Sequence, residues 1–258
     1  MAIKALVIRT AGTNCDEESA VALRLAGADV TVEHINQLKK HADLSAYSIL
    51  AVPGGFSYGD DIAAGKVFSL EIKLNFKDAI ATFVKNGGLV IGICNGFQVL
   101  AKTGLLPDAD FTQRVTLMHN DCGKYQDRHV YLKLNKEGKG AKIWFNGMPD
   151  VIEMPMAHGE GKFFCDDAQL NRVEKDQLVA FRYCDKNGVP ATEFPANPNG
   201  SLNSIAGIFD TTGQVMGLMP HPERIMFKEQ NLAWKDGNVT PWGLQIFKSA
   251  VAYCEGKK

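Results

Sequence analysis

The segment Gly92-Ile-Cys-Asn-Gly96 places a thiol between two glycines, after an apolar run and before a helical pattern. This is the form of a nucleophile elbow, a sharp strand-to-helix turn that exposes its central side chain. The amino end of a helix favours the thiolate of Cys94. The backbone amide of Asn95 can face a developing oxyanion. Because short glycine patterns also arise by chance, the alternative is a buried cysteine in a glycine-rich turn.

A thiol nucleophile needs a base, and Met219-Pro-His-Pro-Glu223 offers His221 with a carboxylate two residues away. His221 follows an apolar run that predicts a strand, so we expect it at the same sheet edge as Cys94. Glu223 could orient the imidazole and stabilise its charged form. The alternative is a surface proline-rich turn with incidental charges.

Other reactive side chains are less favoured. His158 is the rival base, but its glycine-rich segment predicts a flexible loop rather than the end of a parallel strand. Cys15 begins a predicted helix beside three carboxylates that oppose a thiolate, so we expect it to be structural. His119, Cys122 and His129 lack the spacing of zinc ligands, so no metal site is predicted.

A glycine-rich segment, Pro53-Gly-Gly-Phe-Ser-Tyr-Gly-Asp60, follows another predicted strand. Gly54 and Gly55 allow backbone amides to approach a ligand closely, which favours a second oxyanion donor over an ordinary loop. The neighbouring Gly59–Lys66 is not a phosphate loop. It has five residues between its glycines where a Walker loop has four, and Val67 stands where Ser or Thr should bind magnesium.

An alternation of strands and helices must position these segments. Strands are predicted at residues 2–8, 30–35, 48–52, 89–93 and 215–219, and helices from 16 to about 27, around 72–84, from 97, and at 241–253. This order predicts an α/β fold with a doubly wound, mostly parallel sheet, whose ligands bind beyond the carboxyl ends of the strands.

Between residues 111 and 215 the pattern changes to short β-like runs separated by turns, at 130–134, 178–183 and 204–209. We interpret this region as an antiparallel β extension of the same sheet-containing domain, because no linker-like composition separates the two parts. Residues 1–258 are therefore expected to form a single domain.

The composition excludes several classes of protein. With 258 residues, 45% hydrophobic and 22% charged, the chain has the make-up of an ordinary globular protein. The 28 basic and 29 acidic residues give a net charge of −1, so no strong field attracts nucleic acid or an anionic membrane. No apolar run approaches the roughly 18 residues of a membrane span. Six cysteines without a C-x-x-C pair favour reduced thiols and a cytoplasmic location.

Together, these motifs resemble the class I (triad) glutamine amidotransferases, which have a flavodoxin-like α/β fold. The matching segments are Gly12–Asp16, Pro53–Asp60 with Ala64 and Gly65, Gly92–Gln98, His158–Gly161, Asn197–Ser201 and Met219–Arg224. The F-S-Y-G-D, H-G-E-G and N-P-N-G-S segments are typical of the family's purine-biosynthetic glutaminase subunits. Ala11 stands where this group usually has proline.

The resemblance implies a role for each site residue. Cys94 would be the nucleophile, His221 the acid/base and Glu223 its orienting partner. The residues implied in the oxyanion hole or in binding the substrate L-glutamine are Gly54, Gly55, Asn95 and Gln98.

The resemblance also implies a partner, an ATP-dependent synthetase subunit acting on formylglycinamide ribonucleotide, with or without a small bridging subunit. This chain would hold no cofactor, since ATP and magnesium would bind to the synthetase. Three alternatives remain: a glutaminase of another amidotransferase, a stand-alone thiol hydrolase of the same fold, and a non-catalytic module with a decayed site.

Overall fold

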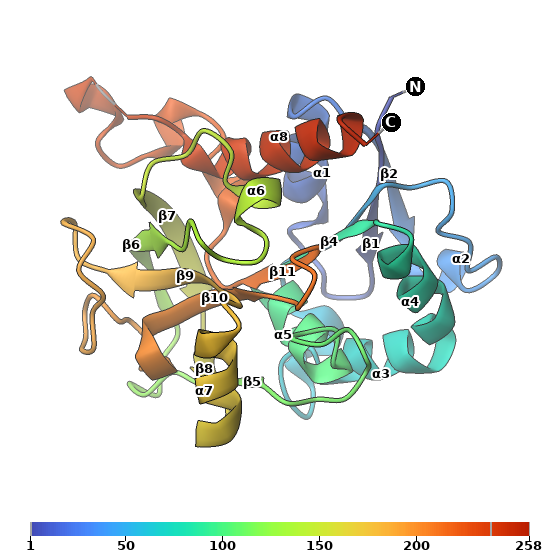
Figure 1. Ribbon diagram of the computed structural model, residues 1–258, viewed down its shortest axis with the longest axis horizontal. Helices are drawn as coiled ribbons and strands as arrows, with labels where there is room; N and C mark the ends of the chain where they lie inside the picture. The colour runs from blue at the N-terminus through green and yellow to red at the C-terminus, as the bar shows by residue number, and fades with distance from the viewer. Residues whose placement is uncertain (1, 238, 258) are drawn as a thin grey trace.

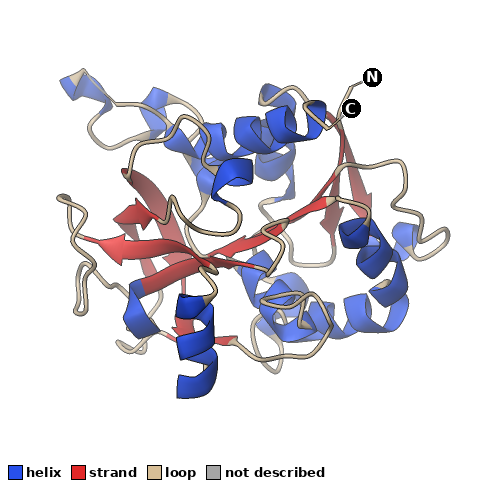
Figure 2. Cartoon of the chain, viewed as in Figure 1, coloured by secondary structure: helices blue, strands red, loops and turns tan. Residues whose placement is uncertain are grey.

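A computed structural model describes residues 2–237 and 239–257 of the chain. Over these residues, one nine-stranded sheet has the order β2-β1-β3-β4-β11-β10-β9-β6-β7 (Figures 1 and 2). The pairs from β2 to β11 are parallel, and the pairs from β11 to β7 are antiparallel. The expected α/β fold with an antiparallel extension is thus confirmed.

The elements follow one another along the chain with these bounds. The strands are β1 (Lys4–Arg9), β2 (Asp29–His34), β3 (Ile49–Val52), β4 (Leu89–Ile93), β5 (Thr116–His119), β6 (Gln126–Leu134), β7 (Val151–His158), β8 (Glu160–Phe164), β9 (Val179–Cys184), β10 (Ile205–Phe209) and β11 (Val215–Leu218). The α-helices are α1 (Asp16–Leu25), α2 (Ile35–Leu38), α3 (Lys66–Asn75), α4 (Lys77–Lys85), α5 (Asn95–Thr103), α6 (Ala141–Trp144), α7 (Asp167–Lys175) and α8 (Trp242–Glu255). The 3₁₀ turns are η1 (Ser57–Asp60), η2 (Leu202–Ser204), η3 (Pro222–Arg224), η4 (Lys228–Gln230) and η5 (Trp234–Asp236).

Helices cover both faces of the parallel half of the sheet. Helices α1 and α8 contact each other on one face, whereas α5 packs on β3, β4 and β11 from the other, beside α3 (Figure 1). Strands buried between two helical layers need apolar side chains on both sides. Every residue of β3, β4 and β11 is buried accordingly.

The carboxyl ends of β3, β4 and β11 meet at one edge of the sheet. In the parallel pairings Val52 lies opposite Gly92, and Leu218 lies opposite Ile93. The segments that follow these strands therefore start side by side. This arrangement brings the loops carrying Gly54, Cys94 and His221 to the same place, as the strand pattern predicted.

Several parts of the expected secondary structure differ. The helix expected around residues 72–84 is two helices, because the buried residue Phe76, which separates α3 from α4, leaves helical geometry (φ −132°). Helix α7 also lies within the region expected to hold only strands and loops. Asp166 caps α7 by accepting a hydrogen bond from the Gln169 amide at 2.8 Å. The helix was not expected because its sequence is mostly polar and shows no clear helical repeat of apolar residues.

Strand β7 places His158 at its end, so the expectation of a flexible loop there was wrong. Its side chains are alternately more and less buried, as in a strand with one covered face. Pro155 interrupts the pattern in the sequence, yet β7 is the last strand of the sheet, where proline is tolerated. None of the helices in the described part of the chain is both long and apolar enough to span a membrane.

Candidate active site

Cys94 occupies the sharp turn between β4 and α5. Its backbone has φ 51° and ψ −106°, a strained conformation for a residue with a side chain, and its amide donates to the Leu218 carbonyl at 2.8 Å. The flanking glycines leave the space that this turn requires. A Cβ on Gly96 would lie 1.8 Å from the Val52 oxygen, and one on Gly92 would lie 2.7 Å from the Gly96 oxygen. The geometry is that of a nucleophile elbow.

His221 and Glu223 follow β11 and lie beside this turn. The His221 amide donates to the Pro155 carbonyl at 2.7 Å, and the imidazole Nδ1 lies 2.6 Å from Glu223 Oε1. Burial opposes a charge on the ring, but the Glu223 carboxylate and then Cys94 outweigh it, so the pKa of His221 is raised well above its ordinary value. With Nδ1 held by Glu223, Nε2 is the ring atom left to exchange a proton.

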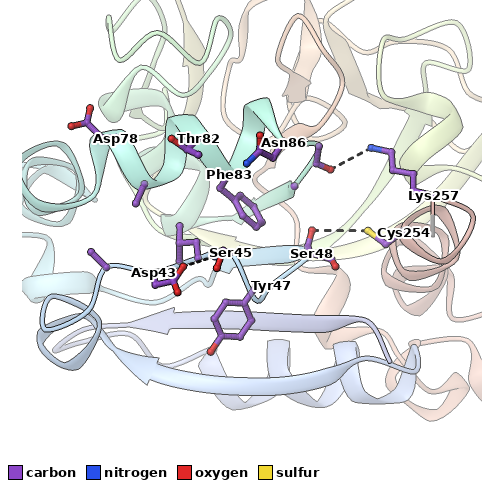
Figure 3. A pocket seen from close by; sticks show the side chains of 15 residues that line it. Asp43, Ser45, Tyr47, Ser48, Asp78, Thr82, Phe83, Asn86, Cys254 and Lys257 are labelled. Atoms are coloured by element: carbon purple, nitrogen blue, oxygen red, sulfur yellow. Dashed lines mark hydrogen bonds between the residues drawn. The ribbon is translucent and has the colours of Figure 1, made fainter. Parts of the chain in front are cut away.

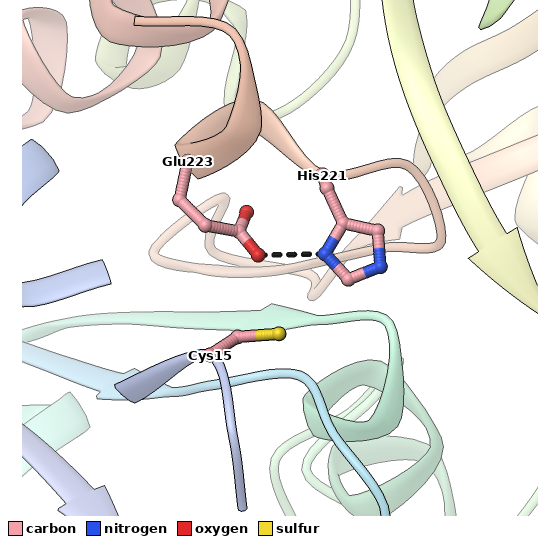
Figure 4. Close-up of side chains that lie close together, drawn as sticks. All are labelled: Cys15, His221 and Glu223. Atoms are coloured by element: carbon pink, nitrogen blue, oxygen red, sulfur yellow. Dashed lines mark hydrogen bonds and ion pairs between the residues drawn. The ribbon is translucent and has the colours of Figure 1, made fainter. Parts of the chain in front are cut away.

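Cys15 also lies in the site, which the expectation of a purely structural cysteine did not foresee. Its Sγ and the ligating atoms of His221 and Glu223 lie within 4.8 Å of one another (Figure 4). Arg224 donates to Cys15 Sγ at 3.0 Å. Burial is the main effect on Cys15 and raises the pKa of its thiol. The positive guanidinium of Arg224 at this sulfur disfavours a bound cation. That this chain holds no metal stays a prediction.

The glycines of the Pro53 loop lie against the side chains of Cys94 and His221. A Cβ on Gly54 would meet His221 Cε1 at 2.9 Å and Cys94 Cβ at 3.4 Å. Gly55 has φ 132°, and a Cβ there would lie 2.6 Å from the Asn14 amide nitrogen. Both positions therefore require glycine. Their proposed part in an oxyanion hole stays a prediction.

Asn95 and Gln98 belong to a buried hydrogen-bond network behind the nucleophile. Asn95 Nδ2 donates to Asp60 Oδ1 at 3.1 Å and to Gln98 Oε1 at 2.9 Å, while Asn95 Oδ1 accepts from the Ser57 hydroxyl. Gln98 Nε2 donates to the Glu160 carbonyl. The network fixes the amide side chains of α5 on the segments that follow β3 and β7.

His158 is a second buried imidazole near Cys94. Asn120 Nδ2 donates to the Lys124 and His158 carbonyls, so Asn120 Oδ1 must face His158 Nδ1, at 3.1 Å, as an acceptor. The proton of His158 is therefore on Nδ1, and Nε2 carries a lone pair. Burial and then the nearby His221 lower the pKa of His158 to about 3. A ring that stays neutral at pH 7 is poorly suited as the general base, which favours His221.

The other candidates occupy separate places. His119 is exposed and lies in the wall of the cavity described below, Cys122 is exposed, and His129 pairs with Glu153 at 3.3 Å. Within residues 2–237 and 239–257, the single cluster of possible metal ligands is the one that contains Cys15, so these three form none. The Asn197–Ser201 segment supports the site indirectly, since Asn199 Nδ2 donates to the Gly161 carbonyl at 2.8 Å.

A cavity of about 260 Å³ opens over Cys94, Gln98 and His221. Its wall also holds side chains for which no catalytic or binding role was predicted: Cys15, Asp60, His119, Tyr125, Glu160 and Arg224. Most of these side chains belong to sequence motifs in which other residues were predicted to have a role. Their presence in the wall depends on contacts between distant segments.

A larger cavity, of about 530 Å³, lies elsewhere, between the loop before β3, helix α4 and the end of α8 (Figure 3). Ser48 and Gly88 in its wall directly precede β3 and β4. It therefore opens at the amino edge of the sheet, opposite the edge that carries Cys94, and takes no part in this site.

Comparison with known proteins gives concordant results. The profile of the CobB/CobQ-like glutamine amidotransferase domain matches residues 2–254. Phosphoribosylformylglycinamidine synthase subunit PurQ of Methanococcus maripaludis is 41% identical over 97% of both chains. The subunit of the same name from Dehalococcoides mccartyi is also 41% identical, again over 97% of both chains. The structure of PurLQS from Thermotoga maritima contains a chain with TM-score 0.74 and 29% identity, covering 98% of this chain and 100% of that one.

Proposed function

Since the chain belongs to the CobB/CobQ-like glutamine amidotransferase family, we propose that it is the glutamine-hydrolysing subunit of phosphoribosylformylglycinamidine synthase, an enzyme of purine biosynthesis. The observation that carries this proposal is the 41% identity to such subunits over nearly the whole length of both chains. The nucleophile elbow and the buried imidazole–carboxylate pair supply the chemistry that glutamine hydrolysis needs. The family expected from the motifs is confirmed.

The reaction proceeds through a thioester at Cys94. The Cys94 sulfur attacks the side-chain amide carbon of L-glutamine, and His221 passes a proton to the departing nitrogen, which leaves as ammonia. Water then loses a proton to His221 and attacks the γ-glutamyl thioester, which releases glutamate and restores the thiol. Glu223 stabilises the imidazolium that forms in each half, and the fixed amides near Gly55 and Asn95 stabilise the oxyanion.

The ammonia passes to an ATP-dependent synthetase subunit, which uses it to convert formylglycinamide ribonucleotide to the amidine. Water would protonate free ammonia and remove its nucleophilicity, so transfer within a complex is part of the proposal. ATP and magnesium are assigned to the synthetase, and no cofactor is assigned to this chain. A cytoplasmic location and a single domain over residues 1–258 belong to the same proposal. The continuous nine-stranded sheet supports the single domain.

Replacing the nucleophile tests this function. In the complex reconstituted with its synthetase, Cys94→Ala should abolish glutamine-dependent synthesis of the amidine while synthesis from added ammonium salt continues. The reason is that only the glutaminase half of the reaction uses the thiol. Synthesis is measured with each nitrogen source in turn.

Cys122→Ala is the matched control, because Cys122 is an exposed thiol outside the cavity. It should leave both activities unchanged. If glutamine supports synthesis by the Cys94→Ala complex at an undiminished rate, the assignment of the nucleophile is wrong.

A further inference from the structure

The cavity at the amino edge of the sheet, of about 530 Å³, is about twice the size of the cavity over Cys94, and glutamine hydrolysis does not use it. One wall is a face of α4, the other is the loop of residues 42–48 before β3, and Cys254 and Lys257 lie at one end (Figure 3). Its volume is in the range of roughly 300–1,000 Å³ that is typical of ligand sites. This amino-edge cavity is therefore large enough for a ligand with more than one functional group.

The floor of the amino-edge cavity is apolar. Phe83 of α4 and Leu44 of the loop line it, and both residues are buried. The Phe83 ring points from α4 toward the loop (Figure 3). A Cβ on Gly88 would lie 2.5 Å from this ring, so glycine at that position leaves the space in which the ring lies. The middle of the cavity thus suits an apolar side chain of a ligand.

Three polar side chains stand in a row along the α4 wall. Asp78, Thr82 and Asn86, the residue that follows α4, are exposed, and their side chains make no hydrogen bond or ion pair with the rest of the described chain. Helical residues four apart are about 6 Å apart along the axis, and alternate residues of an extended peptide are about 6.6 Å apart. A peptide laid along α4 can therefore place every second residue beside one of these side chains.

The two ends of the amino-edge cavity carry opposite charges. Asp43 and Asp78 lie toward one end, and Lys257 lies at the other (Figure 3). The Ser45 amide donates to Asp43 Oδ1 at 2.8 Å and lowers the pKa of that carboxyl, which keeps it charged at pH 7. Lys257 Nζ donates to the Gly87 carbonyl at 3.3 Å, which holds the ammonium just beyond the carboxyl end of α4. In the described part of the wall, an apolar floor thus separates two carboxylates from one ammonium.

The length of the cavity wall identifies the class of ligand. The α4 wall from Asp78 to Asn86 is about 12 Å long. A free amino acid carries its ammonium and its carboxylate on one carbon, so it cannot pair with both ends of the cavity at once. An extended peptide gains about 3.3 Å per residue, so a segment of four or five residues covers the distance. The charges and the length together fit a peptide with a basic residue at one end and an acidic residue at the other.

We propose that the amino-edge cavity binds an extended peptide segment of a partner protein, with a basic residue at the carboxylate end, an apolar residue over Phe83 and an acidic residue beside Lys257. Alternate residues of the segment face α4, which matches the row of polar side chains on that wall. The inference goes beyond glutamine hydrolysis and does not rest on it, because the cavity opens at the sheet edge opposite to Cys94. A partner held there leaves the catalytic cavity uncovered.

The test uses three peptides with blocked ends, so that only their side chains carry charge. One is acetyl-Lys-Ser-Leu-Ser-Glu-amide, and the other two have lysine at both ends or glutamate at both ends. Each peptide is titrated into the full-length chain labelled with nitrogen-15, and the backbone amide shifts give both the dissociation constant and the place of binding. The amides of residues 42–48 and of α4 should shift, whereas those around Cys94 should not.

The wild type should bind the peptide with opposite charges about fivefold more tightly than either like-charged peptide. The reason is that each like-charged peptide replaces one surface ion pair by a repulsion of similar size. Lys257→Glu makes all three charged groups of the wall acidic, so this variant should bind the peptide with two lysines most tightly. Lys85→Glu is the matched control, because Lys85 is exposed on α4 but lies outside the cavity wall. It should keep the wild-type order.

Several results would overturn the peptide site. They are equal affinity of the wild type for the three peptides, no binding of any of them, and an unchanged order of affinities in Lys257→Glu. If the amides of residues 42–48 shift with protein concentration in the absence of peptide, a second copy of this chain covers the cavity instead. If they shift with L-glutamine and not with the peptides, the cavity is an amino-acid site, and the proposal is again wrong.

Discussion

His221 and His158 are buried imidazoles in one cavity, and their surroundings shift them in opposite directions. Glu223 and Cys94 stabilise the charged form of His221, whereas His158 has a neutral amide partner and stays uncharged. Paired groups with separated pKa values commonly have separate chemical roles. His221 can both take and return a proton. His158 Nε2 can accept a hydrogen bond without becoming protonated near pH 7.

Removing the charge of Glu223, the carboxylate paired with His221, should have a specific effect on catalysis. Glu223→Gln should lower kcat for glutamine hydrolysis by about 10²–10⁴-fold, because a neutral amide cannot stabilise the imidazolium and can favour the wrong ring tautomer. The measurement is glutamate release by the complex at saturating glutamine.

Glu229→Gln is the control, because Glu229 is an exposed carboxylate six residues further along the chain. An unchanged kcat in Glu223→Gln would mean that the short contact with His221 serves structure and not catalysis.

Only some of the site could be predicted at the level of single residues. Cys94 and His221 were accessible because each lies in a short motif at the end of a strand, and adjacent parallel strands bring such ends together. The position of Cys15 beside His221 was not predicted, because it depends on distant segments: Arg224, more than 200 residues away in the sequence, contacts its sulfur. Glu160 was not assigned a role, since its approach to Ala64 depends on how the two halves of the sheet meet.

The turn from β4 to α5 depends on glycine at Gly96. Gly96→Ala would drive a methyl group into the Val52 carbonyl, 1.8 Å from its Cβ, and should cost at least about 1–3 kcal/mol of stability. Because the same turn holds Cys94 in its strained conformation, glutaminase activity should fall further than the loss of folded protein explains. Thermal unfolding and glutaminase assays on the same preparation separate the two effects.

Gly256→Ala serves as the control for this change. A Cβ on Gly256 would meet nothing closer than 3.7 Å, and its φ is not positive. It should unfold at the wild-type temperature and retain full activity. A Gly96→Ala protein with wild-type stability would show that the turn relaxes more readily than its contacts indicate.

The strands and helices could be predicted from the sequence where a single pattern, such as a short apolar run, was clear. The strands of the parallel half are short apolar runs bounded by glycine or polar residues, and β4 was predicted with its observed bounds, Leu89–Ile93. Helix α7 was missed because its stability depends on an end cap and one apolar stripe. Strand β7 was missed because it contains Pro155. Proline is normally evidence against a strand, although an edge strand tolerates it.

At the scale of the whole molecule, the cavity lies where the two halves of the sheet meet. The parallel half contributes Cys94 and His221, and the antiparallel half contributes His158 from the end of β7. The Cys94 sulfur lies 3.6 Å from the Ala157 carbonyl, and the His221 amide donates to the Pro155 carbonyl. The antiparallel extension is therefore part of the site and not an accessory to it.

At the scale of the whole molecule, we predict that the rate of glutamine hydrolysis depends on the synthetase partner. The isolated chain should hydrolyse glutamine weakly, and addition of the synthetase should raise the rate, because the proposed function requires ammonia release to be coupled to its use. Glutamate formation is measured with and without the synthetase, and bovine serum albumin at equal concentration controls for nonspecific stabilisation. Full activity of the isolated chain would favour the stand-alone thiol hydrolase.

The contact between β7 and the turn that carries Cys94 also constrains how the sequence can change during evolution. A glutamine molecule bound in the cavity would contact chain segments separated by more than a hundred residues, and each half would contribute only one wall. A substitution that survives in one wall restricts which substitutions the other wall can accept. Recombination that exchanges only the antiparallel half between distant relatives should therefore produce mismatched cavities, even where both parents fold and function.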